Sequence, residues 1–471
     1  MNELKAKRKF GIRDKIGYLF GDLGNDFTFI LSSSFLLKFY TDVMHVSAAV
    51  VGLVMMLARF IDAFTDITMG RICDRSRVTE NGKFKPWILR MCAPVAISSF
   101  LIYQSAFAES AMWFRISWLV VTYILWGSIF YTSINIPYGS MASSISPEPS
   151  ARQSLSTFRS MGSTFAGVIV GAGIPILAYD NKVIGGVEVA ELNGERFTLI
   201  AGIFSILAIL CYLACYYFTE ERVVSDGSEH KQRQKSIPDL IKDAFTNRAI
   251  ISIIAASVVM LLSQFTLQQM ANYVYPDYYA NTSAQSASTF AMLIGMIIAA
   301  SLAKPLVGIF GKSEISAASS VIAGAVCLAL FFIRPENVWI YVFFNFFAWL
   351  GLGVFTMVSW AIITDVIDYS EIKNGIREDG SIYALYSFAR KLGQAAAAGL
   401  TGLLLSFIGY VKTEGEAISS SVKSGIFDIS TIVPAVGFFI LALILFLWYP
   451  LNKRAVDRNV MILKQKRGDI S

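Results

Sequence analysis

The sequence contains few of the residues from which metal centres and catalytic triads are built. Only two of its 471 residues are histidines, His45 and His230. A histidine-based metal site or a Ser-His-Asp triad is therefore disfavoured. No Gly-x-Ser-x-Gly sequence and no phosphate-binding glycine loop stands out, which disfavours an enzyme and predicts no bound cofactor. All five cysteines stand in or beside apolar runs and are expected to be small buried residues: Cys73, Cys92, Cys211, Cys215 and Cys327.

Charged residues are also scarce, at 16% of the chain, whereas 55% of the residues are hydrophobic and the mean hydropathy is +0.56. Soluble domains carry about a quarter charged residues. A helix needs about 20 mainly apolar residues to cross the hydrocarbon core of a membrane. The sequence therefore predicts an all-α integral membrane protein with twelve transmembrane helices, at about 16–40, 48–72, 86–106, 113–142, 155–178, 197–218, 249–275, 285–308, 316–333, 337–364, 380–408 and 427–449.

Lysine and arginine are concentrated in alternate connecting segments. The start of the chain, the segment after the second span, residues 219–248 and the tail after the last span are rich in them. Because cytoplasmic loops carry the excess of basic residues, we expect a multi-pass protein of the cell membrane with both termini in the cytoplasm. The net charge of +6 reflects this excess, so the expected partner is the lipid bilayer and not nucleic acid.

The longest polar segment divides the spans into two sets of six. The predicted domains are an N-terminal six-helix bundle (1–218), a cytoplasmic middle loop (219–248) and a C-terminal six-helix bundle with a cytoplasmic tail (249–471). Transporters built from repeated halves have this layout and hold their substrate near the middle of the membrane. We expect such a protein to be a monomer.

Ionisable residues inside the spans indicate function, because each costs about 2.5–3.5 kcal/mol at the centre of a membrane helix. Asp62 and Asp66 are four residues apart and share a face of the second span, with Arg59 three residues before Asp62. Two neighbouring carboxylates repel unless a positive charge or a proton lies between them. A bound Na⁺ or H⁺ meets this need, and oxygen ligands suit Na⁺. Alternatively, Arg59 neutralises one acid and the other faces water at the end of the helix.

Polar residues of other spans can complete this site or form a second one. Thr132 and Asn135 of the fourth span can add neutral oxygens, or they can simply bond to neighbouring helices. Arg159 opens the fifth span, and Arg390 and Lys391 lie in the eleventh. A guanidinium suits contact with a carboxylate or with sugar hydroxyls, and the alternative is a salt bridge, for instance from Lys391 to an acid of the first or second span. Two tryptophans are candidates for stacking on a sugar ring or for packing: Trp126 and Trp360.

Long segments of the sequence resemble the glycoside–pentoside–hexuronide:cation symporter family, which has the major facilitator fold. The similarity is densest at GYLFGDLGNDF, FYTDV, ARFIDAFTDITMGRICDRSR, GKFKPWIL, YILWG, NIPYGS, TDVIDYSEIKNGIREDGSIY and FARKLGQA. These segments fall in the expected spans and occur in the expected order, and together the similarity extends over most of the chain. The resemblance implies two bundles of six helices and secondary active transport of a sugar with a cation.

The resemblance also implies roles for individual residues. Asp62 and Asp66 match the family's cation-binding carboxylates, so they would be the metal ligands if the cation is Na⁺, and Thr132 matches a hydroxyl beside them. Asp26 matches a sugar-binding acid and Arg159 a sugar-site arginine. Lys391 matches a lysine that lies close to both sites, and with Arg59 it is expected to couple sugar to cation: Asp26, Arg59, Asp62, Asp66, Thr132, Arg159 and Lys391.

Three positions depart from the family's melibiose-carrying members. Asn135 stands where they have an aspartate that serves sugar and cation, Gly139 where they have a tryptophan, and Asn25 where they have a lysine. These residues are therefore predicted to shape a different sugar pocket. With one carboxylate fewer at the cation site, H⁺ is slightly favoured over Na⁺.

The predicted function is cation-coupled symport of a glycoside, pentoside or hexuronide by alternating access, with H⁺ or Na⁺ as the co-transported ion. One alternative is a carrier of lysolipids or other amphiphiles with the same fold. Another is a membrane sugar sensor that transports nothing, and only a flux measurement separates it from a symporter.

Overall fold

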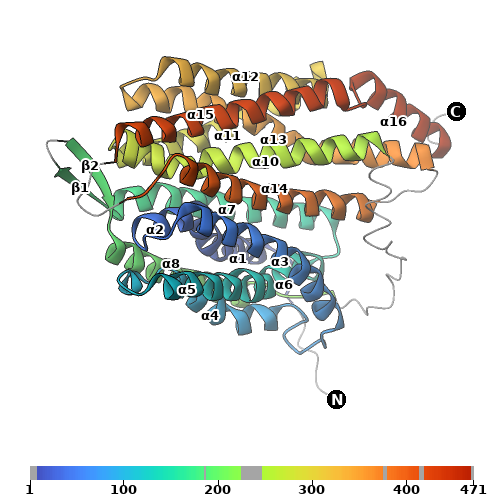
Figure 1. The fold of residues 1–471 in the computed structure, drawn as a ribbon. Helices are drawn as coiled ribbons and strands as arrows, with labels where there is room; N and C mark the ends of the chain where they lie inside the picture. Colours follow the sequence, from blue (N-terminus) through green and yellow to red (C-terminus); the bar gives the residue numbers. More distant parts are fainter. Residues whose placement is uncertain (1–7, 185–186, 224–246, 375–378, 413–417, 468–471) are drawn as a thin grey trace. The chain divides into compact units, whose positions relative to one another are not determined.

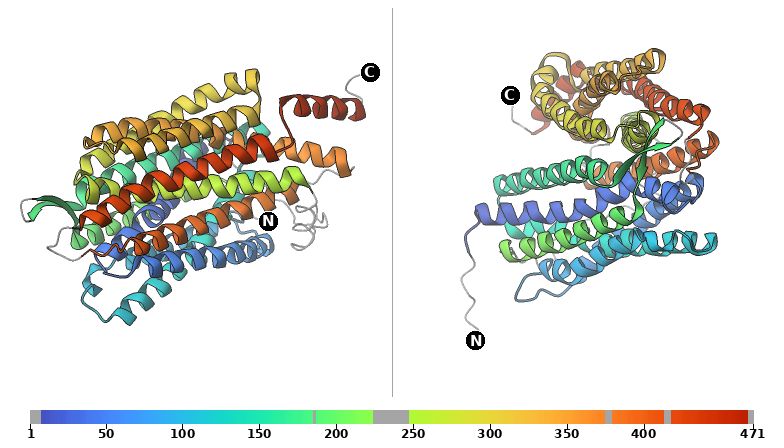
Figure 2. Two further views of the ribbon diagram at one scale, coloured as in Figure 1. Left: turned by 45° about the horizontal axis from the view of Figure 1, so that its top comes forward. Right: turned by 90° about the vertical axis from the view of Figure 1, so that its left-hand side faces the viewer.

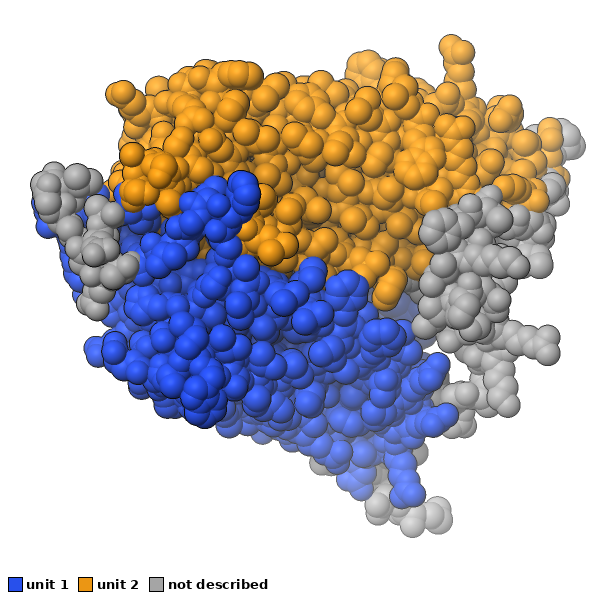
Figure 3. Space-filling model, in the orientation of Figure 1, with its two compact units in different colours: residues 1–230, 405–418 blue, residues 231–404, 419–471 orange. Residues whose placement is uncertain are grey.

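The chain forms two compact units, which Figure 3 shows in different colours. The first unit consists of residues 1–230 and 405–418, and the second of 231–404 and 419–471. Of the middle loop expected at 219–248, residues 224–246 lie outside the described residues. The computed structural model describes residues 8–184, 187–223, 247–374, 379–412 and 418–467.

The first unit is built from long helices and one β-hairpin (Figure 1). Short 3₁₀ or π-helical turns, labelled η, interrupt some of the helices. The elements are α1 (Ile12–Ile30), η1 (Leu31–Phe35), α2 (Leu36–Asp42), α3 (Ala48–Arg75), α4 (Lys85–Ile102), η2 (Ser105–Phe107), α5 (Met112–Ile124), η3 (Leu125–Tyr131), α6 (Thr132–Ile145), α7 (Pro149–Leu177), β1 (Tyr179–Ile184), β2 (Val187–Leu192) and α8 (Gly194–Phe218).

The second unit consists of helices in its described part. Its elements are α10 (Arg248–Tyr273), η4 (Val274–Tyr278), α11 (Thr282–Phe310), α12 (Lys312–Ile333), α13 (Val338–Asn374), α14 (Asp379–Phe407), α15 (Ser420–Leu443), η5 (Ile444–Trp448) and α16 (Lys453–Arg467). Within this unit α15 runs alongside α10 (Figures 1 and 2).

Ten helical segments of the described chain are long and apolar enough to cross a membrane. The two other expected spans, at 16–40 and 380–408, coincide with α1–η1–α2 and with α14, which carry several charged side chains. Large apolar side chains stay exposed along the helices, such as Phe64 at 67% and Leu199 at 63%. Exposed apolar surface of this kind suits contact with lipid.

Close packing through small residues fixes α1 in the first unit, where it lies against both α7 and α8. Gly162 of α7 faces the backbone of Leu19 so closely that a Cβ atom there would clash with the Leu19 carbonyl oxygen. On the other side, a Cβ at Gly24 would lie 3.1 Å from the carbonyl oxygen of Ala208. Small residues let membrane helices approach in this way, so the polar residues of α1 are held at a fixed depth against α7.

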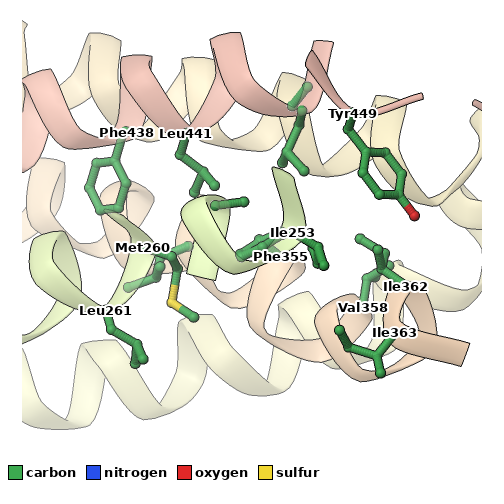
Figure 4. Packing of buried hydrophobic residues seen from close by; sticks show 14 of the residues in the cluster. Ile253, Met260, Leu261, Phe355, Val358, Ile362, Ile363, Phe438, Leu441 and Tyr449 are labelled. Atoms are coloured by element: carbon green, nitrogen blue, oxygen red, sulfur yellow. The ribbon is translucent and has the colours of Figure 1, made fainter. Parts of the chain in front are cut away.

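The core of the second unit is apolar. Side chains of α10, α13 and α15 interdigitate there, with Met260, Phe355 and Phe438 all buried (Figure 4). Burial of large apolar side chains adds about 1.5–3 kcal/mol each in water, but within lipid the gain comes from close packing.

The hairpin β1–β2 was not expected from the sequence, which predicted only a loop between the fifth and sixth spans. Its strands are antiparallel, with Tyr179 opposite Leu192. The side chain of Asn193 caps α8 by accepting a hydrogen bond from the Arg196 amide, and it donates one to Asp180. This bond and the nearby Arg196 guanidinium lower the pKa of the Asp180 carboxyl below its usual range.

The end of α14 and the described residues that follow it, 405–412, belong to the first unit. The hydroxyl of Ser406 accepts a hydrogen bond from the Ala49 amide at the start of α3. Tyr410 donates a hydrogen bond of 2.8 Å to Asp42 and accepts one of 2.9 Å from the buried Lys38 ammonium. The segment is therefore tied to the first unit by a buried network of charges.

Candidate functional site

Two clusters of polar side chains lie between the helices of the first unit. The first centres on Arg159 of α7, whose Nε donates a hydrogen bond of 2.9 Å to the Asp22 carboxylate of α1. The guanidinium also lies over the ring of Tyr138, with 5.4 Å between its carbon and the ring centroid. A Cβ at Gly139 would lie 3.8 Å from Arg159 Nη1, so the missing side chain of Gly139 leaves room beside the guanidinium.

Asp26 lies one helical turn beyond Asp22 on the same face of α1. Ser163 and Arg159 of α7 lie near its carboxylate. The two predicted sugar-site charges, Asp26 and Arg159, therefore belong to one cluster. Asp22, which was not expected at the site from the sequence, is the direct partner of Arg159. Its spacing of four residues from Asp26 is the pattern that could have indicated it.

Asn25 and Asn135 are brought together at the edge of this cluster. Tyr212 of α8 donates a hydrogen bond of 2.9 Å to the side-chain oxygen of Asn25, and the side-chain nitrogen of Asn25 lies 3.5 Å from the side-chain oxygen of Asn135. Asn25 is 1% exposed and Asn135 is half-buried. Asn25 thus links α1 to α8, while Asn135 is the more accessible of the two amides.

The second cluster contains the predicted cation carboxylates of α3. Asp62 accepts a hydrogen bond of 2.5 Å from the Ser128 hydroxyl of η3 and lies 3.3 Å from Arg59 Nη1. A Cβ at Gly127 would lie only 3.6 Å from the Asp62 carboxylate, so the glycine leaves space beside it. The Arg59 guanidinium also lies over the ring of Phe29 of α1, at 5.0 Å.

Asp66 is joined to the fourth span by Thr132, as the sequence pattern suggested. The Thr132 hydroxyl lies 2.9 Å from Asp66 Oδ1 and 3.2 Å from the Gly127 carbonyl oxygen. A hydroxyl has one hydrogen and can donate to only one of these acceptors. The oxygens of Thr132, Asp66 and Gly127 therefore lie close together, and such a set of ligand atoms suits a hard cation such as Na⁺ or an additional proton.

A π-helical turn supplies two of these groups. Gly127 and Ser128 lie in η3, between α5 and α6. Such turns interrupt the regular backbone hydrogen bonds of a helix and occur often at functional sites. Ser128 was missed by the sequence analysis, although its distance of four residues from Thr132 equals that between Asp62 and Asp66.

The remaining predicted residues lie elsewhere. Lys391 is in α14 of the second unit and is half-buried, so its coupling role stays a prediction. Trp126 is fully buried and stacks on Tyr123, which makes it a packing residue. Trp360 of α13 is 41% exposed and lies near Arg390 of α14.

Comparison with known proteins places the chain in a family. The family model described as MFS/sugar transport protein matches residues 17–453. The chain is 29% identical to a putative sulfoquinovose importer of Escherichia coli, over 98% of this chain and 95% of that protein. It is 27% identical to the glucuronide carrier protein homolog of Escherichia coli, over 97% of this chain and 96% of that protein.

Solved structures agree on the fold. The crystal structure of a D-xylose–proton symporter superposes with a TM-score of 0.65 at 14% identity, covering 93% of this chain and 97% of that one. A bacterial homolog of the human lysosomal transporter Spinster gives a TM-score of 0.65 at 13% identity, covering 95% and 97%. At such identities the similarity establishes the fold alone, and it confirms the expected major facilitator fold. The chain is a multi-pass membrane transporter, not an enzyme, and it belongs to the MFS/sugar transport protein family.

Proposed function

We propose that the protein imports a sugar together with H⁺ or Na⁺ by alternating access. The observation that carries this proposal is the cluster formed by Asp62 and Asp66 with the hydroxyls of Ser128 and Thr132. Ionised carboxylates inside membrane helices are energetically costly, and where they occur they often mark an ion or proton pathway. In a member of a sugar transport family, an ion site of this kind supports cation coupling.

The cation binds at Asp66, Thr132 and the Gly127 carbonyl, with Asp62 beside them. Arg59 forms an ion pair with Asp62, and Thr132 donates a hydrogen bond to Asp66. Carboxylate, hydroxyl and carbonyl oxygens can hold either H⁺ or Na⁺. Arg59 and Lys391 are the proposed coupling residues. The ion pair of Arg59 with Asp62 changes energy when the cation site is occupied.

The sugar binds at the cluster of α1, α6 and α7. Asp26 accepts hydrogen bonds from sugar hydroxyls and Arg159 donates them, while Asn135 and the space beside Gly139 determine which sugar fits. Asn25 orients Asn135. Two relatives are named for anionic sugars, as a glucuronide carrier homolog and a sulfoquinovose importer, which favours a sugar acid or its glycoside among the candidate substrates.

We also propose that the protein is a monomer in the cytoplasmic membrane, with both termini in the cytoplasm. A membrane potential of 100 mV supplies about 2.3 kcal/mol for each positive charge that moves inward. At about 1.4 kcal/mol per tenfold change, this accumulates a neutral sugar roughly 50-fold. A sugar acid that enters with one cation moves no net charge and depends on the concentration gradient of that cation.

The test is sugar-dependent alkalinisation of the medium by de-energised cells that express the protein, across glycosides, pentosides and uronides, with and without Na⁺. Alkalinisation with one sugar class supports H⁺ symport, and Na⁺-dependent uptake without proton movement supports Na⁺ symport. Absence of flux with every sugar would contradict the proposal. Uptake of an amphiphile that is inhibited by lysolipids but not by sugars would instead indicate an amphiphile carrier.

A further inference from the structure

Four neighbouring polar groups buried in the first unit have no hydrogen-bond partner among the described residues. They are three hydroxyls and one indole N–H, which belong to Ser32, Tyr103, Tyr123 and Trp126. Each of these side chains is at most 2% exposed, so bulk water does not reach them. Tyr212 is buried to the same degree, but its hydroxyl donates a hydrogen bond to Asn25. Because a buried polar group without a partner is costly, each of the four groups needs one.

The four groups lie together between the first, third and fourth spans. Ser32 lies in η1, and its side chain is close to the hydroxyls of both Tyr103 and Tyr123, although no direct hydrogen bond of normal geometry joins them. Tyr103 directly follows α4, and Tyr123 lies in α5. The Trp126 ring of η3 stacks on the Tyr123 ring, with 5.6 Å between the centroids. One small region therefore contains all four groups.

This region borders the cation site. The hydroxyl of Tyr123 is close to the Arg59 guanidinium, which forms the ion pair with Asp62. Trp126 lies two residues before Ser128, which donates its hydrogen bond to Asp62. Both η1 and η3 are π-helical turns, and such turns are frequent at functional sites. The unpartnered groups and the carboxylates of α3 therefore adjoin each other.

Polar groups continue from this region towards the end of α4. The Tyr103 carbonyl accepts a hydrogen bond of 2.6 Å from the Thr198 hydroxyl of α8, and that hydroxyl lies 3.0 Å from the Ser105 hydroxyl oxygen. Thr198 and Ser105 are both half-buried. Asp62, in contrast, lies near the middle of α3. A row of polar side chains thus leads from the middle of a span to partly exposed residues where α4 ends.

We propose that ordered water molecules bind among Ser32, Tyr103, Tyr123 and Trp126, and that the coupling cation reaches its site through them. This inference rests on the proposed function and adds a path to its cation site. A buried water molecule makes about three hydrogen bonds to polar groups that otherwise lack partners, and these four groups meet that need. Hydroxyls both donate and accept. Water held by them can hydrate Na⁺, or accept H⁺ on one side and release H⁺ towards the α3 carboxylates on the other.

Hydroxyl-radical footprinting of the full-length protein in phosphatidylcholine nanodiscs tests for this water. Radiolysis of ordered water produces radicals that modify adjacent tyrosine rings, even where bulk solvent is excluded. We expect Tyr103 and Tyr123 to be modified several-fold faster than Tyr18 and Tyr212. These two tyrosines are the matched controls, since they are equally buried but their hydroxyls bond directly to protein atoms. Modification of all four at the same slow rate would overturn the inference.

Ser32→Ala tests the path. It removes one partner of the water, so the initial rate of gradient-driven sugar uptake into proteoliposomes should fall about fivefold. Sugar exchange, which needs no net cation movement, should keep the wild-type rate. Tyr123→Phe should act in the same direction. Ser33→Ala is the control, because the Ser33 hydroxyl bonds to the Ile30 carbonyl of its own helix, and its uptake should equal that of the wild type.

The path is contradicted if Ser32→Ala and Tyr123→Phe leave gradient-driven uptake unchanged, or if they slow exchange as much as driven uptake. The two measurements also separate this inference from the proposed function. Gradient-driven uptake by the wild type, with Tyr103 and Tyr123 modified as slowly as the controls, supports symport and overturns the water site. Fast modification of both tyrosines without any gradient-driven uptake supports the water site and contradicts symport.

Discussion

At the scale of single residues, hydroxyl groups beside the carboxylates of α3 decide how well a cation is held. Ser128 and Thr132 are four residues apart on the fourth span, and they contact Asp62 and Asp66, which are four residues apart on α3. The second and fourth spans run in the same direction, because each crossing reverses the chain. The equal spacing therefore brings the two pairs together in register.

Ser128→Ala tests this arrangement. Loss of a hydrogen bond to a charged group costs about 1.5–3 kcal/mol, so the Asp62 carboxylate is held less firmly beside the site. We expect the cation concentration for half-maximal uptake to change by about tenfold or more, with folding intact. Cation dependence of sugar uptake in proteoliposomes measures this effect. Ser133→Ala, at a half-buried neighbour in α6, is the control, and identical behaviour of the two variants would contradict the role of Ser128.

Some of these residues could be predicted from the sequence and others could not. Asp62, Asp66 and Arg159 could be found because a charge within an apolar run needs an explanation. Ser128 could not, since a serine in a membrane helix is ordinary. The pairing of Arg159 with Asp22 also depends on how α1 meets α7, which is set by the contact of Gly162 with the Leu19 backbone.

At the scale of elements, the position of α1 depends on this close contact with α7. Gly162→Ala should destabilise the protein by about 1–3 kcal/mol, because the added methyl group forces the two helices apart. Sugar affinity should fall as well, since Asp22 and Asp26 move with α1. Thermal unfolding in detergent and sugar binding are the measurements.

Gly173 provides the matched control in the same helix. No atom lies within 4 Å of a Cβ built at Gly173, so Gly173→Ala should be neutral or slightly stabilising. Equal melting temperatures for the two alanine variants would show that the α1–α7 contact is not tight.

The connection between α14 and α15 is a second element with a testable role. Asp42 lies 2.8 Å from the Lys38 ammonium and 3.6 Å from that of Lys412, and all three side chains are nearly or fully buried. Asp42→Asn leaves two buried cations with a weakened partner, a change that costs about 3–5 kcal/mol when a buried pair is broken. We expect a lower melting temperature and faster proteolysis at 405–418.

Asp428→Asn serves as the comparison, since it removes a half-exposed partner of Arg334 and surface pairs contribute at most about 1 kcal/mol. If Asp42→Asn melts no lower than Asp428→Asn, the buried network does not hold the segment in place.

Element boundaries were largely predictable from apolar runs, because a membrane helix needs a minimum length. The expected spans at 48–72 and 197–218 correspond to α3 and α8. The packing of 405–418 with the first unit was not predictable. Its determinants, Tyr410 and Lys412, lie in a polar loop and meet Asp42 from a distant part of the sequence.

At the scale of the whole molecule, we propose that cation binding and sugar binding are coupled. Linkage requires that a cation which tightens sugar binding is itself bound more tightly, by the same factor, when sugar is present. The carboxylates of α3 are the proposed origin of this coupling. Without one of them the carrier should still exchange sugar but should no longer accumulate it.

Uphill accumulation in proteoliposomes is the most direct test of this claim. Wild-type protein should concentrate its sugar when an inward H⁺ or Na⁺ gradient is imposed, and an ionophore should abolish the accumulation. Asp62→Cys should lose accumulation while retaining sugar exchange, and Asp457→Asn, at an exposed position of α16, should match the wild type. Undiminished accumulation by Asp62→Cys, or equal sugar levels in wild-type vesicles with and without the gradient, would contradict the account.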